Sequence, residues 1–232
     1  GGIVVPQLLD ALGVEVVPLY CEPNGLFPHN PEPLKEHLSA LCQKVIEVKA
    51  DFGIVVDPDV DRLAFVDETG EIFGEEYTLV SCADYVLTHA PGNTVSNLSS
   101  TKALADVTAS KGGRYFASAV GELNVVEKMK AENAVIGGEG NGGIIYPELH
   151  YGRDALVGIA LFLSLLTEKE IKVSSLKASY PKYAMSKSKV ALSNDMDADE
   201  LFKQIKNQYR KKNPITIDGV KIEFETAWVH LR

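Results

Sequence analysis

The chain has 232 residues, 45% of them hydrophobic and 24% charged, and its 32 acidic residues against 23 basic ones give a net charge of −9. This composition supports an ordinary core and excludes disordered, collagen-like and disulfide-scaffold proteins. The acidic balance, with no basic cluster beyond residues 210–212, argues against nucleic-acid binding. The longest apolar stretch, residues 155–166, is too short to cross a bilayer and no leader-like segment opens the chain, so we expect no membrane partner. Three cysteines without metal-like spacing fit a cytoplasmic location.

The first expected unit covers residues 1–92. In chain order its pattern predicts a helix over 3–12, a Val-rich strand over 14–20, a Pro-rich exposed loop over 21–33, a helix over 34–49, a buried strand over 52–56, a hairpin over 63–73 and a helix over 75–88. Because the chain opens on Gly1 and runs directly into an apolar helix, we expect a fragment from which the preceding strand is missing. Pro91, Gly92 and Asn93 mark the expected boundary to the next unit.

The second expected unit, residues 93–182, alternates strands with helices. The strands are predicted over 94–98, 114–119 and 134–137, and the helices over 102–111, 122–132 and 154–169. Such alternation is typical of a mostly parallel sheet with helices on both faces. The sequence therefore predicts an α/β fold class with two consecutive mixed, mostly parallel α/β/α sandwich domains.

Residues 183–232 show a different pattern. A strand is predicted over 184–192, a helix over 197–212, and a hairpin that turns at Asp218 and Gly219. We interpret this segment as a linker followed by the truncated start of an α+β C-terminal domain.

Three carboxylates alternate in the segment D-P-D-V-D-R, which we call the aspartate loop (residues 57–62). It directly follows a predicted buried strand, and open α/β sheets bind ligands at the carboxyl ends of their strands. Carboxylates this close repel one another unless a cation holds them, and such oxygen ligands suit Mg²⁺, Mn²⁺ or Ca²⁺. We therefore predict that Asp57, Asp59 and Asp61 bind a divalent cation, with a solvated acidic turn as the plainer alternative. Arg62 either balances these carboxylates or binds an anionic substrate.

Two other kinds of protein place aspartates in a similar way. An EF-hand loop needs Gly at its sixth position, where Arg62 stands here, and a strand rather than a helix precedes the loop, so that match is accidental. A haloacid-dehalogenase-like phosphatase also has D-x-D after a buried strand, with the first Asp as nucleophile. That family expects Thr or Val in place of Asp61, and it remains an alternative interpretation.

A second loop, the glycine loop (residues 137–143, G-G-E-G-N-G-G), also follows a predicted strand. Its G-x-G-x-x-G spacing is that of a dinucleotide site, but Ile144 and Ile145 follow where such a site needs a helix. What remains is one carboxylate, Glu139, and one amide, Asn141, on a flexible backbone. These groups suit the hydroxyls of a sugar, and a glycine-rich hairpin without a ligand is the alternative.

Weaker candidates lie at three neighbouring turns. Lys102 ends an S-S-T-K segment that suits phosphate at a helix N-terminus, although a plain helix cap explains the hydroxyls equally well. Glu122 stands at the next strand-to-helix turn. Arg153 is near the glycine loop in sequence, and Asp154 beside it is a natural helix cap.

Taken together, the two loops resemble those of the α-D-phosphohexomutase family, which includes phosphoglucomutase, phosphomannomutase and phosphoglucosamine mutase. The aspartate loop is similar to that family's D-x-D-G-D-R metal loop, and residues 138–143 are similar to its G-E-x-S-G-H sugar loop, in the same order and at a matching separation. The resemblance covers nearly the whole chain. It implies a metal-binding domain over 1–92, a sugar-binding domain over 93–182 and the head of a fourth, phosphate-binding domain over 183–232.

This resemblance also implies a function. The family interconverts hexose 1-phosphates and 6-phosphates of glucosamine, mannose or glucose, which makes its members phosphomutases of the isomerase class. A phosphoserine in the first domain donates the phosphoryl group and a bisphosphate intermediate turns over. Because the first domain and most of the fourth would be absent here, the fragment alone is expected to be inactive.

The resemblance assigns roles to named residues. Asp57, Asp59 and Asp61 would hold Mg²⁺, and Arg62 would assist the reacting phosphoryl group. The implied substrate-binding residues are Glu139, Asn141, Glu122, Lys102 and Arg232. The alternative functions are a haloacid-dehalogenase-like phosphatase and a non-catalytic module that binds sugar phosphates.

Four departures from the family pattern bear on these roles. Val60 replaces the usual Gly of the metal loop and would stiffen it, and Asn141 replaces Ser while keeping its hydrogen-bonding capacity. Gly143 stands where several members have a His that is suspected in proton transfer, so no residue is assigned that role here. Glu122 occupies the place of a His in some mutases, which leaves the preferred sugar open. The form of the glycine loop is most similar to the phosphoglucosamine mutase branch.

Overall fold

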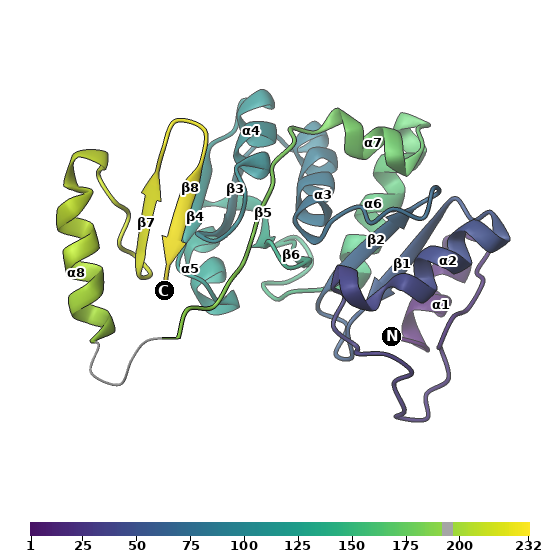
Figure 1. The fold of residues 1–232 in the computed structure, drawn as a ribbon. Helices are drawn as coiled ribbons and strands as arrows, with labels where there is room; N and C mark the ends of the chain where they lie inside the picture. The colour runs from purple at the N-terminus through teal and green to yellow at the C-terminus, as the bar shows by residue number, and fades with distance from the viewer. Residues whose placement is uncertain (192–196) are drawn as a thin grey trace.

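The computed structural model describes residues 1–191 and 197–232. Figure 1 shows a central sheet with its helices, an N-terminal unit at one end and the C-terminal segment at the other. The predicted mixed α/β class is confirmed, and the parallel pairing lies in the central sheet. Among the helices of the described ranges, none combines the length and the hydrophobicity that crossing a membrane requires.

The N-terminal unit is a two-stranded ribbon with helices on it. Its elements are α1 (Val4–Ala11), the 3-10 helix η1 (Lys35–His37), α2 (Ser39–Val48), β1 (Phe52–Val56) and β2 (Leu63–Asp67). β1 and β2 pair antiparallel over their full length. The single helix predicted over 34–49 is instead two elements, η1 and α2. The hairpin predicted over 63–73 is a tight turn closed by one bridge between Val66 and Ile72, because the chain leaves the ribbon to begin the next helix.

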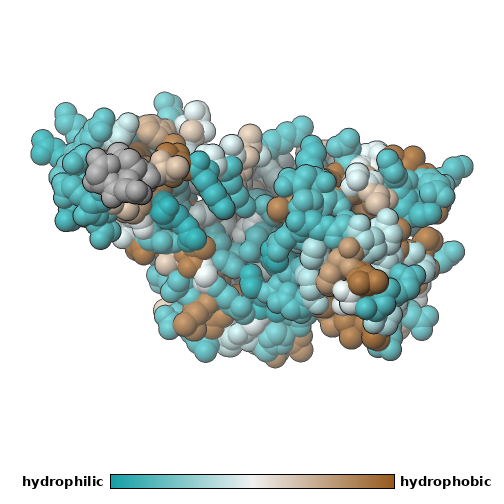
Figure 2. Space-filling model, turned by 60° about the horizontal axis from the view of Figure 1, so that its bottom comes forward, coloured by the Kyte–Doolittle hydropathy of each residue, from teal (hydrophilic) through white to brown (hydrophobic). Residues whose placement is uncertain are grey.

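The strand predicted over residues 14–20 is wrong, since the described chain has no strand there. A Val-rich segment forms a strand only where a neighbouring strand completes its hydrogen bonds, and in the described sheets β1 pairs with β2 alone. Val17 and Tyr20 of this segment are consequently exposed, and Phe27 is exposed in the Pro-rich loop that follows, as predicted. Figure 2 shows hydrophobic residues gathered over this end of a face that is largely hydrophilic.

The central sheet has the strand order β4-β3-β5-β6. It is built from β3 (Asn93–Asn97), β4 (Tyr115–Ser118), β5 (Ala134–Glu139) and β6 (Gly143–Ile145), with β3 parallel to β4 and β5, and β6 antiparallel to β5. The helices around it are α3 (Glu75–His89), α4 (Ala103–Ser110), α5 (Glu122–Glu132), α6 (Ala155–Lys169) and α7 (Val173–Ser179). The three strands and three helices predicted for residues 93–182 begin and end within two residues of their predicted bounds, and α5 matches its prediction at both ends. β6 and α7 were not predicted, and α3, predicted as the last helix of the first unit, packs on the central sheet.

Helices cover both faces of this sheet. On one face α5 buries Val125 and Met129 against Val95 of β3. On the other, α3, α4 and α6 enclose a larger core that continues into the N-terminal unit. Phe65 of β2 stacks on Phe162 of α6 with ring centroids 3.8 Å apart. The two units therefore share one apolar core, which fixes the aspartate loop relative to the central sheet.

The C-terminal segment contains α8 (Ala198–Gln208), the 3-10 helix η2 (Arg210–Lys212), β7 (Val220–Glu223) and β8 (Trp228–Leu231). Residues 184–191 form no strand in the described chain, so the strand predicted over 184–192 is wrong for these residues. Residue 192 lies outside the described residues. This segment is mostly exposed and no neighbouring strand pairs with it among the described residues. Gly219 has φ +61 in the predicted turn, but the turn closes on a single bridge from Ile215, and the hairpin strands are β7 and β8.

Candidate functional site

The aspartate loop turns tightly around the side chain of its first residue. Asp57 follows β1 directly, and its side chain is fully buried. Its Oδ1 accepts the backbone N–H groups of Asp61 and Arg62, both at 3.1 Å, and its Oδ2 accepts Nε–H of Arg62 at 2.6 Å. Although burial raises the pKa of Asp57, these hydrogen bonds outweigh it and hold the pKa below its ordinary value. Asp57 is therefore ionised and anchors the loop.

The three predicted ligands are brought together. Asp57, Asp59 and Asp61 each offer a carboxylate oxygen, and these oxygens lie within 4.8 Å of one another. Asp61 Oδ1 is buried and has no hydrogen-bond partner among the described residues, although Nε of Arg62 lies 3.6 Å away, so this oxygen has room to accept a ligand. Burial raises the pKa of Asp61 to about 6, and the adjacent Asp57 carboxylate adds to this rise. Clustered oxygens with one orphaned buried atom fit a divalent cation, whose charge would remove the repulsion.

Arg62 is held from two sides. Besides its bond to Asp57, its terminal nitrogens donate to both carboxylate oxygens of Glu32, at 2.6 and 3.1 Å. Glu32 comes from the loop that precedes η1, so this pair closes that loop over the aspartate loop. The hydrogen bonds to Glu32 and Asp57 raise the pKa of Arg62, which therefore carries a permanent positive charge beside the carboxylates. Sequence reasoning missed Glu32, because no periodic pattern relates residues thirty positions apart.

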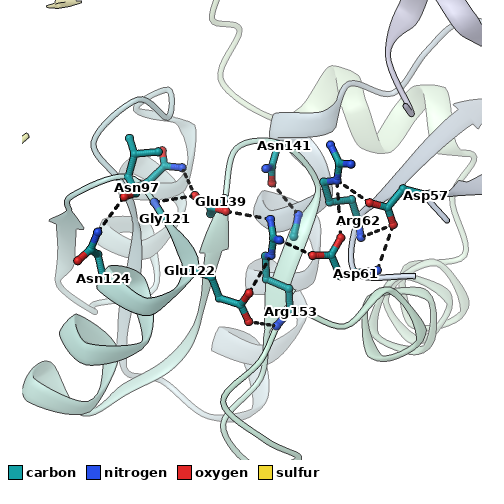
Figure 3. Close-up of polar contacts among 12 residues, drawn as sticks. Asp57, Asp61, Arg62, Asn97, Gly121, Glu122, Asn124, Glu139, Asn141 and Arg153 are labelled. Carbon is teal, nitrogen blue, oxygen red and sulfur yellow. Dashed lines mark hydrogen bonds and ion pairs between the residues drawn. The ribbon is translucent and has the colours of Figure 1, made fainter. Parts of the chain in front are cut away.

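The glycine loop is the turn between β5 and β6, so the hairpin reading of this segment is correct for its backbone. It lies directly against the aspartate loop. The N–H of Leu63 donates to the carbonyl oxygen of Gly142 at 3.0 Å, and Arg62 forms a bridge with Gly143. The loop that carries the predicted metal ligands and the loop that carries Glu139 and Asn141 are therefore neighbours (Figure 3).

Arg153 joins the carboxylates of the two loops. Figure 3 shows its guanidinium between Asp61 and Glu139, with Glu122 on a third side. One terminal nitrogen contacts Asp61 Oδ2, the other donates to Glu139 Oε2 at 3.0 Å, and Nε lies 3.3 Å from Glu122 Oε2. Its nearness to the glycine loop in sequence was the signal for this residue, and the structure adds its contact with the aspartate loop.

Glu139 is more enclosed than its predicted role suggested. Its side chain is 6% exposed, and Oε1 accepts from Asn97 Nδ2 at 3.0 Å and from the N–H of Gly121 at 3.1 Å. Asn97 ends β3 and Gly121 precedes α5, so the carboxyl ends of neighbouring strands meet at Glu139. Among the described residues Oε2 accepts only from Arg153, which leaves this oxygen with capacity for one more donor. Asn97 had no signal in the sequence.

The remaining predicted residues divide into two groups. Asn141 lies in the glycine loop, where its Oδ1 accepts the N–H of Gly143 at 3.2 Å, and Glu122 is part of the Arg153 cluster. Lys102 instead lies 3.6 Å from Glu223 of β7, and Arg232 donates to Asp218 at 3.3 Å. The contacts recorded for Lys102 and Arg232 are with the C-terminal hairpin rather than with the two loops. The substrate-binding roles of all four stay predictions.

Comparison with known proteins identifies relatives of this chain. Residues 1–70 match the family model described as phosphoglucomutase/phosphomannomutase, alpha/beta/alpha domain II, and residues 74–183 match the model of domain III of the same family. A "Phosphoglucomutase/phosphomannomutase" of Thermococcus kodakarensis is 34% identical over 236 residues, which is all of this chain and 51% of the relative. A "Probable phosphoglucosamine mutase" of Methanosarcina barkeri is 32% identical over 234 residues, all of this chain and 53% of the relative.

Solved structures agree with these relatives. The crystal structure of a phosphoglucomutase/phosphomannomutase family protein from Burkholderia thailandensis superposes with a TM-score of 0.86 at 28% identity, covering 98% of this chain and 50% of that one. The crystal structure of a "putative phosphomannomutase" from Thermus thermophilus, 23% identical with a TM-score of 0.76, has the same fold over 98% of this chain and 51% of that one. The chain spans about half the length of the relatives it matches. The boundary expected at residues 91–93 stays a prediction.

Proposed function

This chain belongs to the phosphoglucomutase/phosphomannomutase family, and we propose that it is the central part of an enzyme that moves a phosphoryl group between the 1- and 6-positions of a hexose. The observation that carries the proposal is the contact between the two loops. The clustered carboxylates of the aspartate loop and the hydroxyl-binding groups of the glycine loop are joined through Arg153, so metal, phosphoryl group and sugar would be held together. The substrate is a hexose phosphate of glucosamine, mannose or glucose.

The aspartate loop would hold the metal, and Mg²⁺ is the ion we propose. Asp59 is exposed, Asp61 Oδ1 has no hydrogen-bond partner among the described residues, and Asp57 has room for one more contact at Oδ2. A bound Mg²⁺ would neutralise charge on the phosphoryl oxygens as that group is transferred. Asp57 has a second role, because its bonds to the backbone of Asp61 and Arg62 keep the loop tight whether or not an ion is bound.

Arg62 would bind the transferring phosphoryl group. Three of its N–H groups are engaged by Asp57 and Glu32, and a guanidinium has five, so two remain for phosphoryl oxygens. Fixed donors of this kind stabilise charge that develops in the transition state at little reorganisation cost. Glu139 Oε2 and the amide of Asn141 would receive sugar hydroxyls on the other side of Arg153. A sugar held by hydroxyls in this way can be bound in either of two orientations, which a 1,6-exchange requires.

The haloacid-dehalogenase-like alternative requires Asp57 to attack phosphorus. Oδ1 of Asp57 already accepts two N–H groups and Oδ2 accepts a third, and the side chain is fully buried. A nucleophile needs an oxygen exposed to the substrate, whereas the one remaining contact of Asp57, at Oδ2, is the one proposed for the metal, so the geometry favours an anchoring and metal-binding role. We propose that the phosphoserine donor and the remaining phosphate-binding groups lie in domains that this chain does not contain. A cytoplasmic location is also part of the proposal.

The test is an assay of the full-length protein that carries this chain. With Mg²⁺ present, we expect the enzyme to isomerise at least one of the 6-phosphates of glucosamine, mannose and glucose. The 1-phosphate that forms is measured by ³¹P NMR. The Asp59→Ala variant should lose most of this activity, and the 232-residue chain alone should show none. Release of inorganic phosphate without any 1-phosphate would contradict the mutase and support a hydrolase. Binding without either product would support a non-catalytic module.

A further inference from the structure

We propose that Arg153 is a positioning residue that presents Asp61 to the metal and at the same time fixes Glu139, so that the metal loop and the sugar loop act as one unit. Its role in catalysis rests on the function proposed above, whereas its role in holding the loops can be tested without it. The inference comes from one guanidinium, 19% exposed, that contacts three carboxylates from different segments.

The contact with Asp61 selects one of its two oxygens. Arg153 binds Oδ2, which leaves Oδ1 buried and without a hydrogen-bond partner among the described residues, with Nε of Arg62 at the longer ion-pair distance of 3.6 Å. A metal-binding carboxylate is commonly oriented by a hydrogen bond to its other oxygen, and loss of such a partner weakens metal binding. Arg153 therefore fixes the rotamer in which Oδ2 is held by the arginine and Oδ1 lies on the side of Arg62, within the aspartate loop.

The contacts with Glu139 and Glu122 give the same arginine a hold on the sugar side. Its second terminal nitrogen donates to Glu139 Oε2 at 3.0 Å, and its backbone N–H donates to Glu122 Oε1 at 2.9 Å. Only a forked, planar cation can reach carboxylates on two sides with separate nitrogens. The position of Glu139 is thus coupled to the position of Asp61.

The backbone of Arg153 is itself fixed. It forms a bridge with Ile145 of β6, and the next residue, Asp154, caps α6 by accepting the N–H of Leu156 at 2.7 Å. A Cβ atom on Gly143 would overlap Cδ of Arg153, so the stem of the arginine fills the space into which a side chain at position 143 would point. A side chain at position 143 would therefore require the stem of Arg153 to move.

Charge and position make opposite predictions for metal binding. If Arg153 only balanced negative charge, its removal would leave the aspartate loop more negative and would tighten the binding of a cation. If it orients Asp61, its removal weakens binding in spite of that gain. Arg153→Lys separates the two effects further, because it keeps the charge and loses the fork.

The experiment measures Mn²⁺ binding to the 232-residue chain by electron paramagnetic resonance, for the wild type, Arg153→Met, Arg153→Lys and the control Arg114→Met. Arg114 lies over the ring of Phe116, so the control removes the same side chain from a place outside the two loops. We expect dissociation constants about tenfold higher for both Arg153 variants and unchanged for the control. Tighter binding by Arg153→Met, equal binding by Arg153→Lys, or no Mn²⁺ binding by the wild type would overturn the proposal.

A double-mutant cycle and hydrogen exchange test the coupling itself. Glu139→Gln should weaken Mn²⁺ binding in the wild-type background and have no further effect in Arg153→Met, whereas effects that add in free energy would overturn the coupling. Amide exchange over residues 139–143 should be faster in Arg153→Met than in the wild type or the control, and equal exchange would also overturn it. If these results hold while the full-length protein shows no mutase activity, the proposed function fails and the positioning role stands.

Discussion

The N–H of Leu63 donates to the carbonyl oxygen of Gly142 at 3.0 Å, and this bond joins the first residue of β2 to the glycine loop. It is the backbone counterpart of the side-chain contacts made by Arg153. Because Leu63 follows the aspartate loop directly, the bond fixes the distance between the two loops through the main chain. The arrangement of the site thus depends on a close approach of two backbones, which only glycine allows at position 142.

Replacing Gly142 with Ala should therefore be strongly destabilising. Gly142 has φ +93, and a Cβ there would overlap the carbonyl oxygen of Leu63. Gly112 has φ +78 but open space around it, so Gly112→Ala measures the cost of the backbone conformation alone. We expect Gly112→Ala to lower the free energy of unfolding by about 1 kcal/mol and Gly142→Ala by at least about 2 kcal/mol more, measured by urea denaturation. Equal losses would show that the loops do not approach as described.

At position 60, the Val60→Gly variant of the protein should be more stable than the Val60→Ala variant. Its φ of +62 is unusual for a β-branched residue, and it occupies the place of the usual family Gly. Both substitutions lose the packing of the Val side chain, but only Gly relieves the backbone strain. We therefore expect the free energy of unfolding of Val60→Gly to be about 1 kcal/mol higher than that of Val60→Ala. At the exposed helical position Glu127 the order should be reversed, with Ala about 1 kcal/mol better than Gly. The same order at both positions would contradict the strained loop.

Glu76 should make the stability depend on pH. It lies in the first turn of α3, where its Oε2 accepts the N–H of Thr101 while Oε1 is buried beside Gly140 without a partner. Burial raises its pKa to about 7, above the value of 4.5 for a free Glu side chain. The folded chain therefore binds more protons than the unfolded one between about pH 4.5 and 7, and stability falls as pH rises through this window.

Glu76→Gln removes this ionisation and serves as the measurement. The difference in the free energy of unfolding between Glu76→Gln and the wild type should grow in favour of the variant by up to about 3 kcal/mol from pH 4.5 to pH 7.5. This difference is measured by urea denaturation of both proteins at several pH values. Other titrating groups are common to the two proteins, so their contributions cancel in the difference. A difference that stays constant over this range would show that folding does not raise the pKa of Glu76.

The sequence was informative where short-range patterns decide the structure. Helix α5, which lies between two short strands, begins and ends at the residues predicted for it. The two loops could be recognised because strands that end in carboxylates or glycines leave a local pattern, and the carboxyl ends of strands are where such groups act. The three aspartates were correctly expected to lie together.

The predictions that were wrong or missing share one physical cause, because they concern structure that depends on interactions between residues far apart in the sequence. The segment 14–20 has the composition of a strand, but composition does not supply a pairing partner. The same holds for residues 184–191. The contacts of Glu32 with Arg62 and of Asn97 with Glu139 depend on tertiary placement, and charged or amide side chains in loops carry no periodic signal. Arg153 was noticed through its neighbourhood in sequence, whereas its contact with Asp61 required the fold.

The most direct test of the account is the paramagnetic broadening of backbone amide signals when Mn²⁺ is added to the ¹⁵N-labelled chain. If the aspartate loop holds the ion and the glycine loop lies against it, signals from both 57–62 and 139–143 should broaden at substoichiometric Mn²⁺, while Gly112 stays sharp and Asp59→Ala abolishes the effect. Broadening confined to the aspartate loop, or centred elsewhere on the chain, would contradict the claim that one site holds both the metal and the sugar.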